Sequence, residues 1–178
     1  MAKTTKILIA GFGGQGILFT GKALAYTGLK AGMEVSWLPS YGPEMRGGTA
    51  NCSVTLSDEP IGSPIVDKPD VLIAMNLPSL EKYFYETEKG GFIVYDSSLV
   101  SKENDRADVT VVGIPATKMA SDNALEGLAN MIILGKVLKE TGVLTLEQIE
   151  SSLAQMVPAK KADLLQNNIK AIELGYNF

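Results

Sequence analysis

Residues 6–17, KILIAGFGGQGI, decide the fold. The run KILIA is short, apolar and rich in β-branched side chains, which is typical of a central parallel strand buried on both faces. The glycine-rich turn GFGGQG follows at residues 11–16, and residues 17–31 then read as a helix. Gly21 and Gly28 fall on one ridge of this helix, so it can lie close to a sheet. A strand, a glycine turn and a helix in this order predict an α/β protein.

The rest of the chain continues the alternation of strands and helices. Further strands are predicted at residues 34–38, 51–56, 70–75, 92–96 and 109–114, with a helix at 78–88. The strand at 51–56 alternates polar and apolar side chains, which is typical of a half-buried strand. Three helices are predicted from residue 125 onward. The apolar spacing of Leu125, Leu128, Ile132 and Leu138 indicates the first, and residues 146–156 form the second. The third has an inner stripe of Ala162, Leu165, Ile169 and Ile172. We expect one domain over residues 1–178 with a three-layer α/β/α, Rossmann-like fold, a largely parallel sheet and a helical C-terminal part.

The composition of the chain argues against several classes of function. The 178 residues are 46% apolar and carry a net charge of -4, without a long run of Lys or Arg, which argues against nucleic acid or a membrane surface as partner. The apolar run near the N-terminus is too short for a signal peptide, so a cytoplasmic protein is expected. A single cysteine cannot supply the four thiolates of an iron-sulfur cluster, and the absence of histidine lowers the expectation of zinc or histidine-based hydrolysis.

The glycine turn allows three interpretations. Its G-x-G-x-x-G pattern between a strand and a helix fits a dinucleotide site. Such a site usually needs an Asp or Glu near the end of the second strand. The only acidic residue of that strand here, Glu34, lies at its start. The glycines could instead serve only a tight turn and close packing. A third interpretation is an anion site made of backbone N–H groups at the helix N-terminus, with Gln15 reaching across it as a neutral donor or acceptor.

A second loop, PSYGPEMRGG at residues 39–48, follows the second strand. In a doubly wound sheet it would face the first glycine turn across a crevice. Arg46 offers a planar charged fork for carboxylate or phosphate and Glu44 could orient it, although a surface ion pair is the simpler interpretation. The candidate cofactor-binding residues are Gly11, Gly13, Gly14, Gln15, Gly16, Ser40, Tyr41, Gly42, Glu44, Arg46, Gly47 and Gly48. No catalytic or metal-binding residue is predicted.

Four segments together resemble a known family: GFGGQG, SYGPEMRGG, the KPDVLIAM strand and ANMIILG. They resemble the gamma subunit, or the equivalent fused domain, of 2-oxoacid:ferredoxin oxidoreductases, over nearly the whole chain. The SYGPE-x-RGG form is closer to the 2-oxoglutarate and branched-chain 2-oxoacid members than to the pyruvate members.

The resemblance implies one subunit of a cytoplasmic complex that is inactive alone. Such complexes decarboxylate a 2-oxoacid on thiamine diphosphate, pass electrons through iron-sulfur clusters to ferredoxin and transfer the acyl group to coenzyme A. This chain has no Gly-Asp-Gly segment of the magnesium-diphosphate motif, so thiamine diphosphate, Mg and the clusters are expected on sister alpha, beta and ferredoxin-like delta subunits. This subunit would serve coenzyme A positioning and assembly, and the isolated chain could form a homodimer. The alternatives are a stand-alone nucleotide-binding or regulatory module and a pure assembly subunit.

Three further features carry expectations. Cys52 lies on the apolar side of its predicted strand and is expected to be a small buried residue rather than a reactive thiol. Asn130 lies in a helix that is apolar on most of its circumference and would need a polar partner there. The aromatic cluster at residues 83–85 is the better candidate for a protein interface, whereas Trp37 suits a core equally well.

Overall fold

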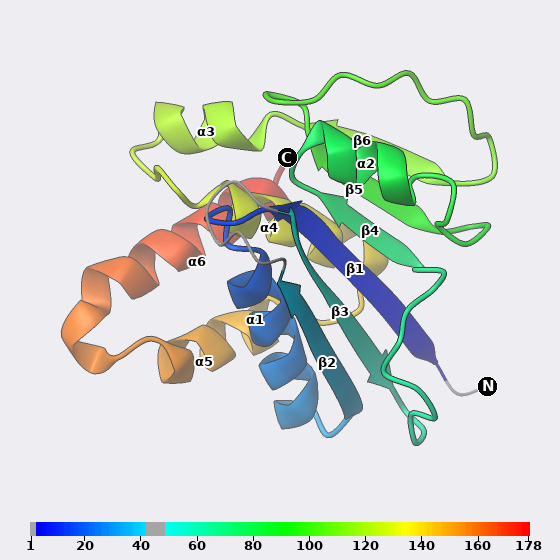
Figure 1. Ribbon diagram of the computed structural model, residues 1–178. Coiled ribbons are helices and arrows are strands. Elements are labelled where there is room, and N and C mark those ends of the chain that lie inside the picture. Colours follow the sequence, from blue (N-terminus) through cyan, green and yellow to red (C-terminus); the bar gives the residue numbers. More distant parts are fainter. Residues whose placement is uncertain (1–2, 42–48) are drawn as a thin grey trace.

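The computed structural model describes residues 3–41 and 49–178 (Figure 1). Its described strands form one six-stranded sheet in the order β2-β3-β1-β4-β5-β6. The strands are β1 (Thr4–Phe12), β2 (Glu34–Tyr41), β3 (Thr49–Ser57), β4 (Val71–Ala74), β5 (Phe92–Asp96) and β6 (Thr110–Ile114). β1, β4, β5 and β6 pair in parallel, while β3 runs antiparallel to both β1 and β2. The sheet is therefore largely parallel in direction, as predicted, with β3 as the reversed strand.

The helices lie on both faces of this sheet. They are α1 (Ile17–Lys30), α2 (Leu77–Tyr83), α3 (Ala116–Asp122), α4 (Ala129–Thr141), α5 (Leu146–Met156) and α6 (Ala162–Tyr176), with a short 3-10 turn at Ala159–Lys161. Helices α1, α4, α5 and α6 share the larger apolar core with one face. On the other face, α2 and the segment between β5 and β6 enclose a smaller core (Figure 1). The expected three-layer α/β/α arrangement is confirmed, and none of the described helices has the length and apolarity needed to cross a membrane.

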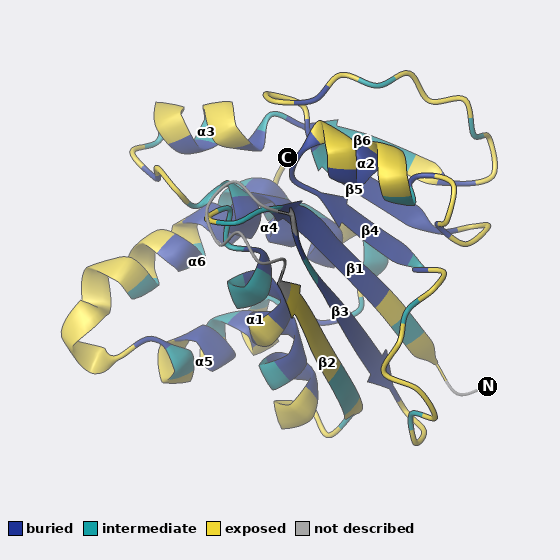
Figure 2. Cartoon of the chain, viewed as in Figure 1, coloured by how far each residue is buried: buried dark blue, intermediate teal, exposed yellow. Residues whose placement is uncertain are grey.

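β3 is more deeply buried than predicted. Its position between β1 and β2 leaves neither edge free, and Ser53, Thr55 and Ser57 are buried on one face while Cys52 and Val54 are buried on the other. Figure 2 shows the dark buried band that runs along β1 and β3, beside the exposed edge strand β2. The polar alternation that suggested a half-buried strand thus reflects a second face covered by protein, on which Ser57 bonds Thr4 across the strands at 2.7 Å.

α1 packs closely on the sheet because of its small residues. A Cβ at Gly28 would lie 2.5 Å from Leu56 Cδ2, and one at Gly21 would overlap Cys52 Sγ. Both contacts are side chains of β3, so the expected glycine ridge faces this strand. The structure confirms that these glycines let the helix lie close to the sheet.

Two helix boundaries differ from the prediction. α2 ends at Tyr83 rather than near residue 88, and the Arg106 guanidinium donates to the carbonyls of Phe84 and Thr87 beyond its end. Farther along, α4 begins at Ala129, because Leu125 belongs to a turn in which its N–H donates to Ala120 O at 2.8 Å. Both differences arise from contacts between segments, which periodicity does not report.

Candidate ligand site at the carboxyl edge of the sheet

The glycine turn after β1 depends on backbone conformations that glycine adopts readily. Gly14 has a φ of 97° and Gly16 a φ of 75°, and Gln15 N donates to Phe12 O at 3.2 Å to close the turn. At Gly11 the limit is space instead of φ, because a Cβ there would lie 2.6 Å from Gln15 Oε1 and 2.9 Å from Met75 Cβ. The turn therefore brings the backbone into close contact with the end of β4.

Gln15 braces this turn. Its Oε1 accepts from Phe12 N at 2.7 Å, and its Nε2 donates to Met75 O at 2.9 Å. The sequence suggested that Gln15 could reach across a ligand site, but both ends of its amide are already engaged within the protein. Gln15 thus fixes the glycine turn against β4, and it also lines the cavity described below, so its contact with a ligand stays a prediction.

Asn130, at the start of α4, holds the other side of the turn. Its Nδ2 donates to Thr20 Oγ1 at 3.0 Å and to Gly16 O at 3.3 Å. The Thr20 hydroxyl donates its proton to Gly16 O, so its oxygen can only accept a hydrogen bond from Asn130. This arrangement fixes the orientation of the Asn130 amide. The predicted need of Asn130 for a polar partner is confirmed, and within the part of the chain that is described its Oδ1 has no partner.

α3 is attached to the same edge by a buried carboxylate. Asp96 is fully buried at the carboxyl end of β5 and accepts from Thr117 N at 3.1 Å, from Thr117 Oγ1 and from Ser98 N at 3.0 Å. These hydrogen bonds satisfy the buried charge and set the position of α3. Sequence analysis missed α3, and the only signal available was an aspartate ending a predicted strand.

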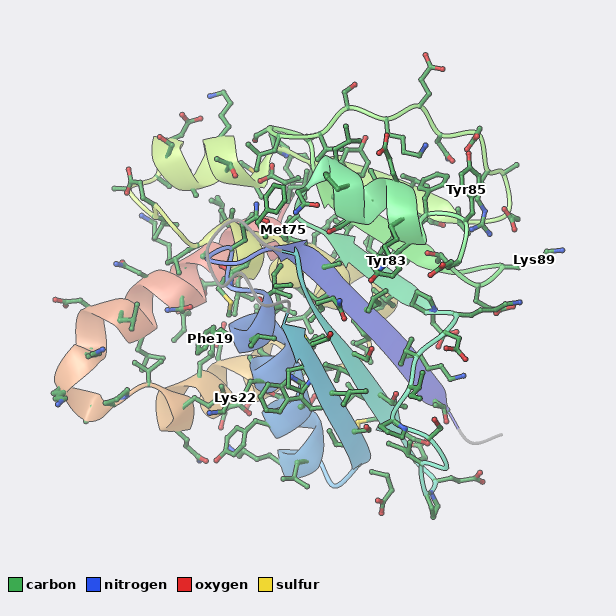
Figure 3. All side chains as sticks on the ribbon, viewed as in Figure 1. Phe19, Lys22, Met75, Tyr83, Tyr85 and Lys89 are labelled. Atoms are coloured by element: carbon green, nitrogen blue, oxygen red, sulfur yellow. The ribbon has the colours of Figure 1, made fainter. Side chains whose placement is uncertain are left out.

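These elements enclose a cavity of about 380 Å³, called the edge cavity below. Its lining comes from the glycine turn, the residue after β4, α3, the turn between α3 and α4, and the start of α4. The lining residues are Gly14, Gln15, Met75, Thr117, Ala120, Ser121, Glu126, Gly127, Ala129 and Asn130. Figure 3 shows Met75 at this edge, with Tyr83 and Tyr85 beside α2 on the other face of the sheet. These segments meet at the carboxyl end of the parallel strands, where open α/β sheets bind their ligands.

The second loop was predicted over residues 39–48, but residues 39–41 belong to β2, which ends at this edge. Tyr41 ends β2 opposite Ala50, and Ala50 pairs with Gly11 of the glycine turn. Ser40 is exposed near the end of β2. The candidates Gly42, Glu44, Arg46, Gly47 and Gly48 lie outside the described residues.

The described part of the chain places neither a reactive thiol nor a metal-binding cluster at the edge cavity. Cys52 is fully buried below α1, and burial raises the pKa of its thiol to about 12, which confirms its structural role. Among residues 3–41 and 49–178, no group of three acidic, cysteine or histidine side chains is placed to hold a metal ion. The lining offers hydroxyl and amide side chains, the carboxyl group of Glu126 and apolar surface.

Comparison with known proteins supplies the family. The family model described as pyruvate ferredoxin/flavodoxin oxidoreductase matches residues 6–178. This chain belongs to that family. The match covers nearly the whole chain and confirms the resemblance found in the sequence.

Two curated members of the family match this chain, one as part of a longer subunit and one over almost its whole length. The chain is 39% identical over 173 residues to the ketoisovalerate oxidoreductase subunit VorA of Methanothermobacter thermautotrophicus, covering 96% of this chain but 35% of that subunit. It is 36% identical over 174 residues to the 2-oxoglutarate synthase subunit KorC of Methanocaldococcus jannaschii, covering 96% of this chain and 91% of that subunit. The chain thus spans about a third of the first relative and almost all of the second.

Solved structures of the family agree with this fold. A keto/oxoacid ferredoxin oxidoreductase gamma subunit from Geobacter sulfurreducens superposes with a TM-score of 0.84 at 28% identity, over 98% of this chain and 95% of that one. The 2-oxoglutarate:ferredoxin oxidoreductase from Magnetococcus marinus, solved with 2-oxoglutarate, coenzyme A and succinyl-CoA bound, superposes with a TM-score of 0.89 at 25% identity, over 98% of this chain and 31% of that one.

Proposed function

We propose that this chain is the gamma subunit of a 2-oxoacid:ferredoxin oxidoreductase, a cytoplasmic complex in which it works only with its sister subunits. The complex would convert a 2-oxoacid and coenzyme A to an acyl-CoA and carbon dioxide, with the released electron pair passing to ferredoxin. The observation that carries the proposal is the match to gamma-type subunits of nearly the same length, KorC and the Geobacter sulfurreducens chain.

The chemistry of the chain supports a role without a redox cofactor of its own. One buried cysteine does not fit an iron-sulfur cluster, and the sequence lacks the magnesium-diphosphate motif of thiamine enzymes. Both groups would therefore sit on alpha, beta or delta subunits. What remains for this chain is binding and orientation, which can lower a reaction barrier by holding the reactants together.

Coenzyme A is the reactant that this subunit would position. The Magnetococcus marinus enzyme, of which about a third matches this chain, was solved with coenzyme A bound. In this chain the edge cavity and the glycine turn lie at the sheet edge where ligands of such folds bind. Arg46 would add a cation for the phosphates from the second loop.

For the 2-oxoacid we propose 2-oxoglutarate or a branched-chain acid. KorC is named for 2-oxoglutarate and VorA for ketoisovalerate, and both are more similar to this chain than the pyruvate synthase subunit PorC of Thermotoga maritima, at 29% identity. The thiamine-bearing subunits would make the final choice.

The deciding experiment is anaerobic native purification of the chain from its own cells, followed by mass identification of its partners. The eluate is assayed for 2-oxoacid-dependent and coenzyme A-dependent reduction of a low-potential acceptor, with 2-oxoglutarate, ketoisovalerate and pyruvate compared. We expect larger subunits and activity to elute together. Elution of the chain alone, inactive but with bound nucleotide, would favour a stand-alone nucleotide module instead.

A reconstitution experiment distinguishes a pure assembly role from the positioning role. In a complex reconstituted with and without this chain, loss of activity accompanied by loss of the other subunits' association indicates a pure assembly role. Loss of the coenzyme A-dependent step in a complex that otherwise stays assembled supports the positioning role proposed here.

A further inference from the structure

We propose that a sister subunit docks on the side of α2 that faces the start of β3, and that it inserts one aspartate or glutamate side chain into a small pocket there. The pocket, called the α2 pocket below, has a volume of about 140 Å³ and shares no lining residue with the edge cavity. Its lining residues are Ala10, Ala50, Asn51, Pro78, Ser79, Lys82 and Tyr83. The inference rests on the proposed function, which makes this chain one subunit of a complex.

The polar side chains of the α2 pocket have hydrogen-bonding capacity left over. Ser79 is only 5% exposed, and its N–H donates to Asn76 Oδ1 at 2.8 Å, while its hydroxyl has no hydrogen bond to a described residue. The Asn51 amide and the Tyr83 hydroxyl likewise bond no described side chain or backbone group. Because a polar group that leaves water loses stability unless it is hydrogen-bonded, these groups favour an occupant that brings acceptors into the pocket.

The charge of the pocket favours an acid. Lys82 Nζ lies 4.9 Å from the centroid of the Tyr83 ring, a contact that keeps the ammonium group at the pocket, and it forms no ion pair with a described carboxylate. The lining contains no Asp or Glu. A carboxylate in the pocket accepts a charge-assisted hydrogen bond from Lys82 and a further one from Ser79, whereas a cation there is repelled.

The size of the pocket favours a single side chain. A cavity of about 150 Å³ takes a benzene ring, so the α2 pocket, at about 140 Å³, can hold the few heavy atoms of an aspartate or glutamate side chain. Sites for drug-sized ligands and cofactors are larger, at about 300–1,000 Å³. One side chain inserted into a pocket is a common centre of a protein interface.

The surface beside the pocket is not covered by a helix of the described chain. α1 packs on one face of β2 and β3, whereas α2, on the other face, lies over β1 and β4 (Figure 1). Leu38 of β2 pairs with Ser53, two positions from Asn51, so it lies on the same face as the pocket and is 41% exposed. Exposed apolar surface next to a polar pocket suits a protein partner.

Tyr83 is the member of the predicted aromatic interface cluster that reaches this surface. Phe84 is fully buried, and the Tyr85 hydroxyl donates to Asp105 outside the pocket. The aromatic residue of the proposed interface is therefore Tyr83, whose ring also contacts Lys82.

The relatives favour a sister subunit over a second copy of this chain. The matched module makes up 35% of VorA but 91% of KorC, so the same fold occurs both within a longer chain and as a separate subunit. A surface that contacts the remaining polypeptide in VorA would contact a sister subunit where the module is a separate chain, as in KorC.

The first test couples Lys82 to its partner in the complex purified anaerobically from its own cells. A water-soluble carbodiimide joins a carboxylate to a contacting lysine amine as an amide, while the reagent takes up the water and becomes a urea. We expect mass analysis to find Lys82 coupled to an aspartate or glutamate of a sister subunit. Coupling of Lys82 to a second copy of this chain would overturn the proposal, and so would an uncoupled Lys82 in a complex whose other lysines have reacted.

Substitutions then measure the contact by the amount of sister subunits that co-purify with the tagged chain. We expect Lys82→Glu to lower this amount about tenfold or more, and Ser79→Ala to lower it about threefold, because each removes a donor to the inserted carboxylate. The control is Lys89→Glu, an exposed lysine that does not line the pocket and points outward in Figure 3, which should stay within about twofold of the wild type.

Thermal melting of each variant checks that it is folded, and Ser79→Ala removes no hydrogen bond to a described residue that folding could need. Equal recovery of sister subunits with folded Lys82→Glu and Lys89→Glu chains would overturn the docking proposal and leave the proposed function intact. If no sister subunit co-purifies with the wild-type chain, the proposed function itself is contradicted.

Discussion

Single side chains determine the geometry of the glycine turn. The G-x-G-x-x-G pattern predicts the turn correctly, but it cannot predict that Gln15 bonds Met75, which lies 60 positions along the chain. Gly16 similarly faces Asn130, whose amide group leaves no room for a Cβ there. A local pattern identifies the residues that permit a conformation, and distant residues decide how it is held.

Replacement of Gln15 tests this brace. Gln15→Ala should lower the free energy of unfolding by about 1–3 kcal/mol, because Phe12 N and Met75 O would lose their partners in a partly buried place. Chemical denaturation of the isolated chain measures the change. The matched control is Gln155→Ala, which removes one exposed hydrogen bond to Tyr26 and should cost about 0.5 kcal/mol or less. Equal effects of the two substitutions would show that Gln15 is not a brace.

Cys52 should be chemically silent in the folded protein. Burial raises the pKa of its thiol to about 12, and its Sγ contacts Ile17 O at 3.5 Å beneath α1. Because the thiolate is the reactive form, an aromatic disulfide reagent should not modify Cys52 at pH 7 to 9 and should modify it fully in denaturant. Rapid labelling of the native chain, followed photometrically, would contradict this burial.

At the scale of elements, α4 and α6 cross in close contact. A Cβ on Gly135 would overlap the carbonyl oxygen of Ile172, and one on Gly175 would overlap that of Ile132. The two helices thus touch backbone to backbone, and each glycine serves a close approach. Neither glycine has a positive φ, so space is the only reason for its small size.

Enlarging either glycine should separate these helices. Gly135→Ala or Gly175→Ala should each destabilise the protein by about 1–3 kcal/mol or more, since the clashing atoms are backbone and cannot rotate away. Gly62→Ala is the control, because nothing lies within 4 Å of its Cβ position and its φ is not positive. Thermal melting compares the three variants. A melting temperature for Gly135→Ala equal to that of Gly62→Ala would refute the tight crossing.

Elements with a strong local pattern could be predicted from the sequence, and those set by tertiary contacts could not. β1, the glycine turn and α1 combine a β-branched run, glycines and a long apolar stripe, so they were found correctly. α3 has only seven residues, and its position depends on Asp96, 20 positions before it. A helix this short shows no clear apolar periodicity in the sequence, so it was not predicted. The edge cavity was therefore predicted only on its glycine-turn side, and its α3 wall was missed.

The surface of the whole molecule combines a hollowed sheet edge with exposed outer helices. The carboxyl edge of the sheet carries the glycine turn and the edge cavity, while α5 and α6 form an outer layer with exposed outward faces (Figure 2). Glu150 of α5 lies within reach of the charges of two exposed carboxyl groups, Glu147 of the same helix and Glu173 of α6. With a net charge of -4, the chain has no surplus of cations to offset such a group.

This acidic group makes the stability of the whole fold depend on pH. Burial, then the charges of Glu173 and Glu147, raises the pKa of Glu150 above its ordinary value. A carboxyl group with a raised pKa in the folded state contributes stability that is present below the unfolded-state pKa and is lost as pH rises through the folded-state pKa. At neutral pH the charged Glu150 therefore weakens the fold, and Glu150→Gln should stabilise it by about 0.5 kcal/mol or less, since solvent screens these side chains.

The gain from Glu150→Gln should shrink as pH falls toward about 4, where the wild-type carboxyl also becomes neutral, and should shrink with added salt. Asp105 and Asp108 change stability in the opposite sense, because hydrogen bonds from Tyr85 and Arg106 respectively lower their pKa values. Comparing the variant with the wild type at each pH cancels their effect and isolates Glu150. Glu81→Gln, on exposed α2, is the control. A gain that persists unchanged at pH 4 would mean that packing of the amide, rather than removal of charge repulsion, stabilises the variant.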